Sequence, residues 1–233
     1  MAQRFGIEGY RVYLSDIQTE LGEQACLQLR RQGADCRFVR ADVCSKSDLS
    51  QLILKAVEES GSLDVMINNA GLAIIGPSED VTEEEWDLSI NVMQKGVFFG
   101  CQEAAKSMKK QGKGIIINVS SINAEVSFPF RLSYCAAKAA VSSMTRVLAL
   151  EWAPYGIRVN AVAPGVTRTQ MVAKAIEEKH IDDMAYLNRI PMRRFGEPDE
   201  IANAVYFLCS EQASYINGEV LTVDGGWSVN GFI

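Results

Sequence analysis

The sequence predicts an α/β fold with a doubly wound parallel sheet, in a single domain that spans residues 1–233. Six short apolar runs alternate with longer amphipathic segments, which is the pattern of parallel strands joined by helical crossovers. Each run is apolar on both sides of the pleat, as strands between two helical layers are. The runs are YRVYLSD from residue 10, CRFVRADV from 36, LDVMINNAG from 63, GIIINVSS from 114, IRVNAVAPG from 157 and EVLTVDGG from 219.

Two of the intervening helices carry recognisable ends. Thr82 and Glu85 have the spacing of a capping box at a helix N-terminus. Gly156 is expected to end a long, alanine-rich helix that begins near Ser133. The small residues of that helix suit close packing, either inside the domain or across a subunit interface.

Composition and charge narrow the class of protein. The formal net charge of −6 disfavours a nucleic-acid partner or an anionic membrane surface. No apolar run approaches the roughly 18 residues of a membrane span, and the N-terminus lacks the apolar core of a signal peptide. The six cysteines form no C-x-x-C pair, so we expect reduced thiols and a cytoplasmic enzyme.

The chain contains one histidine, His180. A Ser-His-Asp triad and a histidine-rich metal site are therefore improbable, and base chemistry must come from another residue type. His180 lies in the charged segment EEKHIDD. We expect it to be solvated, with a substrate contact as the alternative.

Residues suited to ligand binding follow five of the six apolar runs. In a doubly wound sheet, ligands bind at the carboxyl ends of the strands. Taken singly, each residue has a structural explanation such as a cap or a turn, but five such ends in succession favour one shared cleft. In chain order these ends carry Asp16, Asp42 with Val43, the run Asn68-Asn69-Ala70-Gly71, Ser120 with Ser121, and Pro164 with Gly165.

Tyr134 and Lys138 follow the fourth of these ends and are four residues apart. On a helix this spacing places the phenol and the ammonium on one face, so the cation can stabilise a phenolate. A tyrosine in this situation can transfer protons near neutral pH. We therefore expect the chemistry to reside in residues 114–138.

Together these motifs resemble the classical short-chain dehydrogenase/reductase family, which has a Rossmann-type fold and uses a nicotinamide cofactor. The resemblance covers almost the whole chain, through NNAG, Asn91, Ser121, the Y-x-x-x-K pair, IRVNAVAPG and VDGG. It implies that Tyr134 is the catalytic acid and base and that Ser121 holds the substrate oxygen. Lys138 is expected to lower the pKa of Tyr134 and bind the nicotinamide ribose, and Asn91 to support a water that links Lys138 to solvent.

The resemblance also assigns cofactor contacts. A carboxylate at Asp16 would accept hydrogen bonds from an adenosine ribose and repel a 2′-phosphate. Ile17 beside it supplies no compensating cation, so NAD is predicted rather than NADP. The other matching positions are Asp42 and Val43 at the adenine, Asn69, Ala70 and Gly71 near the ribose, and Pro164, Gly165, Thr167 and Thr169 at the carboxamide and phosphates.

The N-terminus departs from the family pattern. Family members begin with a strand and a glycine-rich turn, T-G-x-x-x-G-x-G, that binds the pyrophosphate. Here the first nine residues have the character of a helix end, with Gly6 and Gly9 at its C-cap. We expect an incomplete sequence, in which the missing first strand leaves the backbone groups of two neighbouring strands unpaired.

Residues 168–195 match the family segment that closes over the substrate, with a plain pair of surface helices as the alternative. The expected reaction interconverts a secondary alcohol, in a sugar, polyol or hydroxy acid, and its ketone by hydride transfer with NAD. A 3-oxoacyl-thioester reductase and a catalytically silent scaffold are the alternatives. Candidate substrate contacts are Met171, Met184, Tyr186 and Met192 in that segment, and Asn123, Phe128, Phe130 and Arg131 ahead of Tyr134.

Family members are commonly tetramers, so the resemblance implies a homo-oligomer, either a tetramer or a dimer. The helices that follow Asn91 and surround Tyr134 would form the contact. The residues small enough for such packing are Cys101, Ala104, Ala105, Ala139 and Ala140.

Overall fold

The computed structural model describes residues 1–178 and 182–231 and contains all six predicted strands. Every strand pairing in this part of the chain is parallel, as the alternating sequence pattern predicts. The strands are β1 (Val12–Asp16), β2 (Cys36–Arg40), β3 (Val65–Asn68), β4 (Gly114–Val119), β5 (Ile157–Pro164) and β6 (Val220–Val223).

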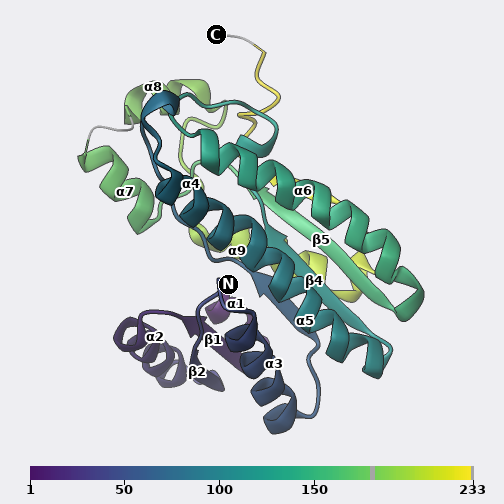
Figure 1. Cartoon of the computed structure of the whole chain (residues 1–233). Coiled ribbons are helices and arrows are strands. Elements are labelled where there is room, and N and C mark those ends of the chain that lie inside the picture. The colour runs from purple at the N-terminus through teal and green to yellow at the C-terminus, as the bar shows by residue number, and fades with distance from the viewer. Residues whose placement is uncertain (179–181, 232–233) are drawn as a thin grey trace.

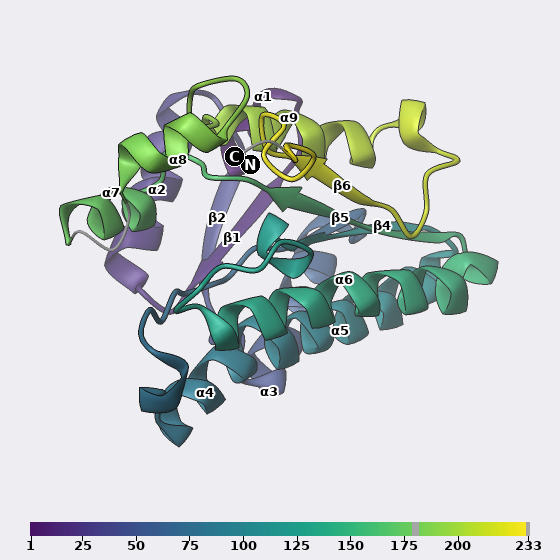
Figure 2. The same cartoon turned by 90° about the horizontal axis from the view of Figure 1, so that it is seen from above.

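Helices cover both faces of the sheet, as a doubly wound fold requires. Helices α5 and α6 pack on one face of β4 and β5, and α9 packs on the other (Figure 2). Within the described residues, no helix is long and apolar enough to cross a lipid bilayer. The longer helices are α2 (Thr19–Arg31), α3 (Lys46–Ser60), α4 (Glu83–Ile90), α5 (Gly96–Gln111), α6 (Leu132–Trp152) and α9 (Pro198–Cys209), and a short α1 (Ala2–Ile7) precedes them.

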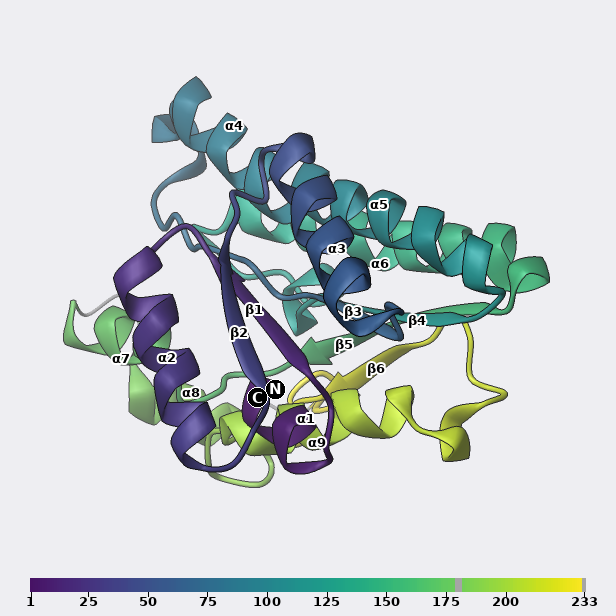
Figure 3. The same cartoon turned by 90° about the horizontal axis from the view of Figure 1, so that it is seen from below.

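The strands form two separate sheets. One contains β1 and β2, and the other has the order β3-β4-β5-β6. Among the described residues no strand is hydrogen-bonded between β1 and β3, and Figure 3 shows the two-stranded unit set apart from the larger sheet. Helix packing joins the two parts instead, because α1 contacts α9 and α3 contacts α5. Phe5, Val12 and Val65 add an apolar cluster against α9.

Local sequence signals predict the helix ends correctly. Thr82 Oγ1 accepts the N–H of Glu85, and the Glu85 carboxylate accepts the N–H of Thr82, which completes the capping box of α4. Gly156 follows α6 and a short 3₁₀ turn with a left-handed φ of 72°. Gly9 has a φ of 83° after α1, as predicted, whereas Gly6 lies inside that helix.

The small residues of α5 lie inside the domain. Cys101 and Ala104 are fully buried and Ala105 nearly so, in the core between α5, α6 and the larger sheet. The prediction that these three residues pack across a subunit interface is therefore wrong, because their side chains already contact the same chain. The oligomeric state itself stays a prediction.

A polar network is buried between β3, β4, α5 and α6. Asn118 Oδ1 accepts a hydrogen bond from Asn68 Nδ2 at 2.9 Å, and Asn118 Nδ2 donates to Thr145 Oγ1 at 2.9 Å. Cys101 Sγ lies 3.3 Å from Asn68 Nδ2 and from Asn118 Oδ1. Because every member has a partner, the network stabilises one packing of α6 on β4.

We predict that Asn118→Ala lowers the free energy of unfolding by about 2 to 4 kcal/mol, because Asn68 loses its oxygen acceptor and a cavity opens beside it. Urea denaturation followed by circular dichroism measures this change. Asn203→Ala, on the exposed face of α9, is the matched control and should change stability by less than about 0.5 kcal/mol. A loss at Asn118 no larger than this control value would contradict the structural role of the network.

Candidate active site

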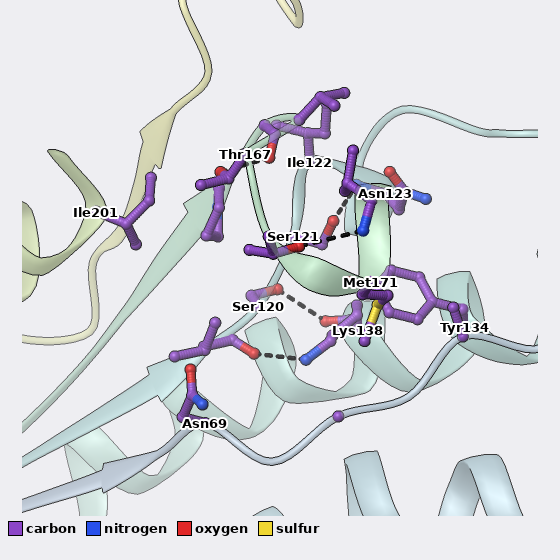
Figure 4. Close-up of a pocket in the computed structure, with 18 of the residues that line it drawn as sticks. Asn69, Ser120, Ser121, Ile122, Asn123, Tyr134, Lys138, Thr167, Met171 and Ile201 are labelled. Atoms are coloured by element: carbon purple, nitrogen blue, oxygen red, sulfur yellow. Dashed lines mark hydrogen bonds between the residues drawn. The ribbon is translucent and has the colours of Figure 1, made fainter. Parts of the chain in front are cut away.

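A pocket of about 530 Å³ lies at the carboxyl ends of the strands. Residues at the ends of β1, β3, β4 and β5 and in the first turns of α6 line it. Figure 4 shows several of these side chains. The shared cleft expected from the sequence is therefore present. The predicted site residues that line it are Asp16, Asn69, Ala70, Gly71, Ser121, Tyr134, Lys138, Pro164, Gly165, Thr167 and Thr169.

Tyr134 and Lys138 lie on one face of α6, as their spacing predicts. Lys138 is only 3% exposed, and its Nζ lies 5.6 Å from the centroid of the Tyr134 ring. The same Nζ donates to the carbonyl oxygen of Val119 at 2.7 Å (Figure 4). The ammonium is therefore held between the phenol ring and the end of β4.

Two serines follow β4 and have different functions. Ser120 Oγ donates to the carbonyl oxygen of Lys138 at 3.1 Å and lies 2.8 Å from Ser142 Oγ, so it fastens β4 to α6. Ser121 Oγ accepts the N–H of Asn123 at 3.1 Å. This bond orients the Ser121 hydroxyl and leaves its proton available to a group in the pocket.

Burial governs the protonation of the two groups on α6. Burial raises the pKa of Tyr134 above its ordinary value, while the Ser121 hydroxyl and the Arg131 guanidinium act in the opposite direction. Burial lowers the pKa of Lys138 to about 8. The expected lowering of the Tyr134 pKa is therefore not found in this geometry, because the loss of hydration outweighs the nearby favourable groups.

Asp16 ends β1 and lines the same pocket as Tyr134. Its Oδ1 accepts the N–H of Gln18 at 2.9 Å, which orients the carboxylate. The pocket thus holds both an acceptor carboxylate and the pair of Tyr134 and Lys138, which are the kinds of group that would bind the two ribose ends of a nicotinamide dinucleotide. The sequence holds no T-G-x-x-x-G-x-G turn, so this fit concerns the two ribose ends alone.

Four of the predicted catalytic and cofactor-binding residues do not line the pocket. Ile17 is exposed beside Asp16. Asp42 and Val43 follow β2, the strand that pairs with β1, and neither is among the residues that line the pocket. Asn91 begins a π-helical turn (Asn91–Lys95) that packs against α6. Turns of this type are frequent at functional sites, and the expected water relay through Asn91 stays a prediction.

The loop after β5 forms another wall of the pocket. A Cβ added at Gly165 would lie 2.7 Å from Asp224 Cα, so the close approach of the VDGG segment requires glycine here. Thr167 Oγ1 donates to the carbonyl oxygen of Gly165 at 3.1 Å. Thr169 Oγ1 accepts the N–H of Val172 at 3.3 Å and caps the next helix. Both threonines shape the loop, and their cofactor contacts stay predictions.

The segment of residues 168–195 leaves the sheet and returns at the same place. Thr167 and Gly196 form a parallel bridge at its base, and the N–H of Arg168 donates to the carbonyl oxygen of Gly196 at 2.9 Å. The helices within it, α7 (Gln170–Glu177) and α8 (Asp183–Arg189), project from one end of the molecule in Figure 1. The segment is also held elsewhere, because the N–H of Met192 donates to the carbonyl oxygen of Gly225 at 3.2 Å and Asn230 Nδ2 donates to the carbonyl oxygen of Arg189 at 3.0 Å. Closure of this segment over a substrate stays a prediction.

The lid contributes some of the predicted pocket residues. Met171 and Tyr186 line the pocket, whereas Met184 and Met192 are exposed and lie outside its lining. The prediction for these last two residues is wrong, because both are largely exposed to solvent. His180 lies outside the described residues.

An aromatic cluster joins the lid to the rest of the site. Phe128 stacks on Trp227 with ring centroids 5.4 Å apart, and Tyr186 packs on Trp227 at 5.3 Å. Phe128 and Asn123 line the pocket as predicted. Phe130 does not line the pocket, contrary to prediction, since its ring is exposed.

Sequence reasoning missed part of the pocket. Val119 supplies a backbone carbonyl to Lys138, and a carbonyl leaves no signal in residue identity. Ile201 reaches the pocket from α9, which only the folded topology brings near. The remaining apolar positions that were missed include Leu72, Ala73, Ile122 and Val166.

Comparisons with known proteins agree with this geometry. A family model described as Enoyl-(Acyl carrier protein) reductase matches residues 1–228. Cyclopentanol dehydrogenase from Comamonas sp. (strain NCIMB 9872) is 39% identical over 223 residues, which cover 96% of this chain and 89% of that protein. NAD-dependent glycerol dehydrogenase from Listeria innocua serovar 6a is 35% identical over 229 residues, which cover 98% of this chain and 88% of that protein.

A solved structure shows the same fold with ligands bound. Gluconate 5-dehydrogenase from Burkholderia cenocepacia J2315, in complex with NADP and tartrate, matches with a TM-score of 0.92 at 29% identity. The match covers 98% of this chain and 89% of that chain.

The fold and the pocket are those of an oxidoreductase built on a Rossmann-type sheet. The chain belongs to the classical short-chain dehydrogenase/reductase family, as its ordered motifs predict. Its relatives support oxidoreductase activity on a CH–OH group, and the family uses nicotinamide cofactors.

We predict that Lys138→Met stabilises the protein more at pH 7 than at pH 10. The folded-state pKa of about 8 lies below the ordinary 10.5, so below pH 8 the folded chain must bury a charged ammonium. As the pH rises from 8 to 10.5 the folded state loses that proton before the unfolded state does, and wild-type stability recovers by up to about 3 kcal/mol.

Urea unfolding of both proteins at pH 7 and pH 10 measures the difference. Lys110→Met, at an exposed position of α5, is the control. Its free energy of unfolding should differ from that of the wild type by the same amount at pH 7 and at pH 10. If the stability difference between Lys138→Met and the wild type is also the same at both pH values, the proposed cost of burying the Lys138 ammonium is contradicted.

Proposed function

We propose that the protein is an NAD-dependent dehydrogenase that interconverts a secondary alcohol, in a sugar, polyol or hydroxy acid, and its ketone. The observation that carries this proposal is the meeting of Ser121, Tyr134 and Lys138 in a single pocket that Asp16 also lines. These residue types supply a proton acceptor, a hydrogen-bond donor and a cation, which are the protein groups that alcohol oxidation needs.

Each residue has a defined step in the proposed reaction. Ser121 Oγ donates a hydrogen bond to the alcohol oxygen and orients it, and Tyr134 Oη takes the proton from that oxygen. A bound nicotinamide dinucleotide would supply the acceptor for the hydride of the carbinol carbon. The C–H electron pair and the O–H proton leave together, so the alcohol becomes a ketone. Lys138, whose Nζ lies 5.6 Å from the phenol ring centroid, stabilises the phenolate form that takes up the proton.

Asp16 favours NAD over NADP in this proposal. Its carboxylate at the end of β1 would accept hydrogen bonds from a ribose and repel a 2′-phosphate, and the neighbouring Ile17 offers no cation. The Listeria relative is named as NAD-dependent, whereas the Burkholderia structure holds NADP. Since both cofactors occur among the similar proteins, the proposal of NAD for this chain is based on Asp16.

The substrate is proposed to be a small alcohol. The relatives are named for a cyclic alcohol, a polyol and a sugar acid, and each name places the reacting group on a CH–OH carbon. The net charge of −6 disfavours docking of an acidic carrier protein, which a 3-oxoacyl-thioester reductase would require.

We expect the enzyme to function as a homotetramer or dimer in the cytoplasm. All six cysteines are free thiols, which suits a reducing compartment. Exposed Val147 and Leu150 on α6 offer apolar surface to a partner subunit.

We predict that Tyr134→Phe lowers kcat/KM by about 10²- to 10⁴-fold, because it removes the proton acceptor and little else. The absorbance of reduced nicotinamide, recorded with NAD and a panel of sugars, polyols and hydroxy acids, gives the rates. Tyr155→Phe, at an exposed tyrosine outside the pocket lining, is the control. Activity that survives Tyr134→Phe would contradict the mechanism, and no activity in the parent chain would favour a silent scaffold.

We predict that Asp16→Asn reduces the preference for NAD over NADP by about tenfold or more, because repulsion of the 2′-phosphate is lost. Fluorescence titration with the two reduced cofactors measures the ratio of dissociation constants. Asp80→Asn makes the same change in net charge at an exposed residue and should leave the ratio unchanged. An unchanged ratio in Asp16→Asn would remove Asp16 as the discriminating residue.

A further inference from the structure

Arg131 places an unpaired cation at the catalytic end of the pocket. It precedes the first turn of α6, three residues before Tyr134, and lines the pocket. Its charge is close enough to act on the Tyr134 phenol. Among the residues that the structure describes, no side chain forms an ion pair or hydrogen bond with its guanidinium. Arg146 on α6, by contrast, pairs with Glu125 at 3.7 Å.

A strained backbone positions this arginine. Phe130, directly before it, has a φ of 64°, a left-handed conformation that a bulky residue rarely adopts. Its carbonyl oxygen accepts the N–H of Gly76 at 3.0 Å, which fixes the turn against the loop after β3. The Phe130 ring is 56% exposed, so burial of the ring does not explain the strain. The turn at Phe130 instead leads the chain into α6 and places Arg131 in the pocket lining.

The charged side chains around the pocket provide no partner for the Arg131 guanidinium, so an anionic ligand could bind to it. The charged side chains that line the pocket are Asp16, Arg131 and Lys138. Lys138 is already bound to the Val119 carbonyl, and Asp16 belongs to the separate two-stranded sheet. A neutral substrate that displaced water from this half-buried guanidinium would leave its donors unpaired. A carboxylate would satisfy them with charge-assisted hydrogen bonds.

The same end of the pocket limits the size of the substrate. Phe128 and Tyr186 form an aromatic wall that Trp227 supports, and Asn123 adds an amide at the loop after β4. Arg131 is the N-cap residue of α6, three residues before Tyr134, and both line this pocket, so a group bound by Arg131 lies near one bound by Tyr134. The bound acid is therefore short, with only a few bonds between its carboxylate and its carbinol carbon.

We propose that Arg131 binds the carboxylate of the substrate, and that the alcohol oxidised at Ser121 and Tyr134 is a short-chain hydroxy acid. This inference rests on the proposed dehydrogenase function and narrows its substrate class. Arg131 determines specificity, because it touches the substrate carboxylate rather than the carbon and oxygen that react.

The test compares each acid with its neutral counterpart in the full chain. Rates with NAD are measured for lactate against propane-1,2-diol, 3-hydroxybutyrate against butane-1,3-diol, and gluconate against sorbitol. The parent chain should prefer at least one acid. Arg131→Met should lower the acid-to-diol ratio of kcat/KM by about tenfold to a hundredfold, mainly through KM, and Arg131→Lys should retain part of the ratio. Arg146→Met, on the same helix and outside the pocket lining, should leave the ratio unchanged.

A binding measurement separates this inference from the proposed function. Calorimetric titration of the chain with malonate needs no turnover, and Arg131→Met should weaken binding by about tenfold or more. Oxidation of the diols with no preference for any acid would overturn the Arg131 inference and leave the dehydrogenase proposal intact. If no alcohol is oxidised, the dehydrogenase proposal fails, and the malonate titration still decides whether Arg131 binds carboxylates. Equal malonate affinity in the parent chain, Arg131→Met and Arg131→Lys would overturn it.

Discussion

The catalytic half of the pocket depends on one joint between α6 and the end of β4. Lys138 buries its ammonium and donates to the carbonyl oxygen of Val119, and Ser120 binds the backbone of Lys138 in return. These two bonds fix two successive residues at the end of β4, Val119 and Ser120, to a single residue of α6, Lys138. Ser121 directly follows Ser120, and Tyr134 lies one helical turn before Lys138. The contact between α6 and β4 therefore positions both hydroxyls. A buried ammonium is costly, and its acceptor and the aromatic ring beside it offset part of that cost.

The cofactor half of the pocket is held differently. Asp16 belongs to a two-stranded sheet that no described strand joins to the larger one, so its position relative to Tyr134 depends on packing of α1 on α9 and of α3 on α5. A hydrogen-bonded ladder sets neighbouring strands about 4.8 Å apart, whereas helix packing tolerates variation in angle and distance. The proton-handling groups are therefore placed more rigidly than the carboxylate that would select the cofactor.

Local patterns in the sequence predict most of the fold and the centre of the site. The strands follow from apolar runs, the ends of α4 and α6 from Thr82 and Gly156, and the pairing of Tyr134 with Lys138 from helical spacing. What could not be predicted depends on contacts distant in sequence. The carbonyl of Val119 carries no side-chain signal, and the burial of Cys101 and Ala104 inside the domain depends on which faces of α5 and α6 meet. Met184 and Met171 look alike in sequence, and only the path of the lid separates them.

The two proposed roles of Arg131 and Lys138 place different electrostatic demands on the pocket. Burial raises the pKa of Tyr134, and Arg131 is one of the groups that lower it. A carboxylate bound to Arg131 would neutralise that charge, so the guanidinium would stop assisting the phenolate just when substrate is present. The phenolate would then rely on Ser121 and on Lys138, whose ammonium is buried and beyond the reach of solvent screening. The proposed roles would thus assign substrate recognition to Arg131 and support of proton transfer to the buried Lys138.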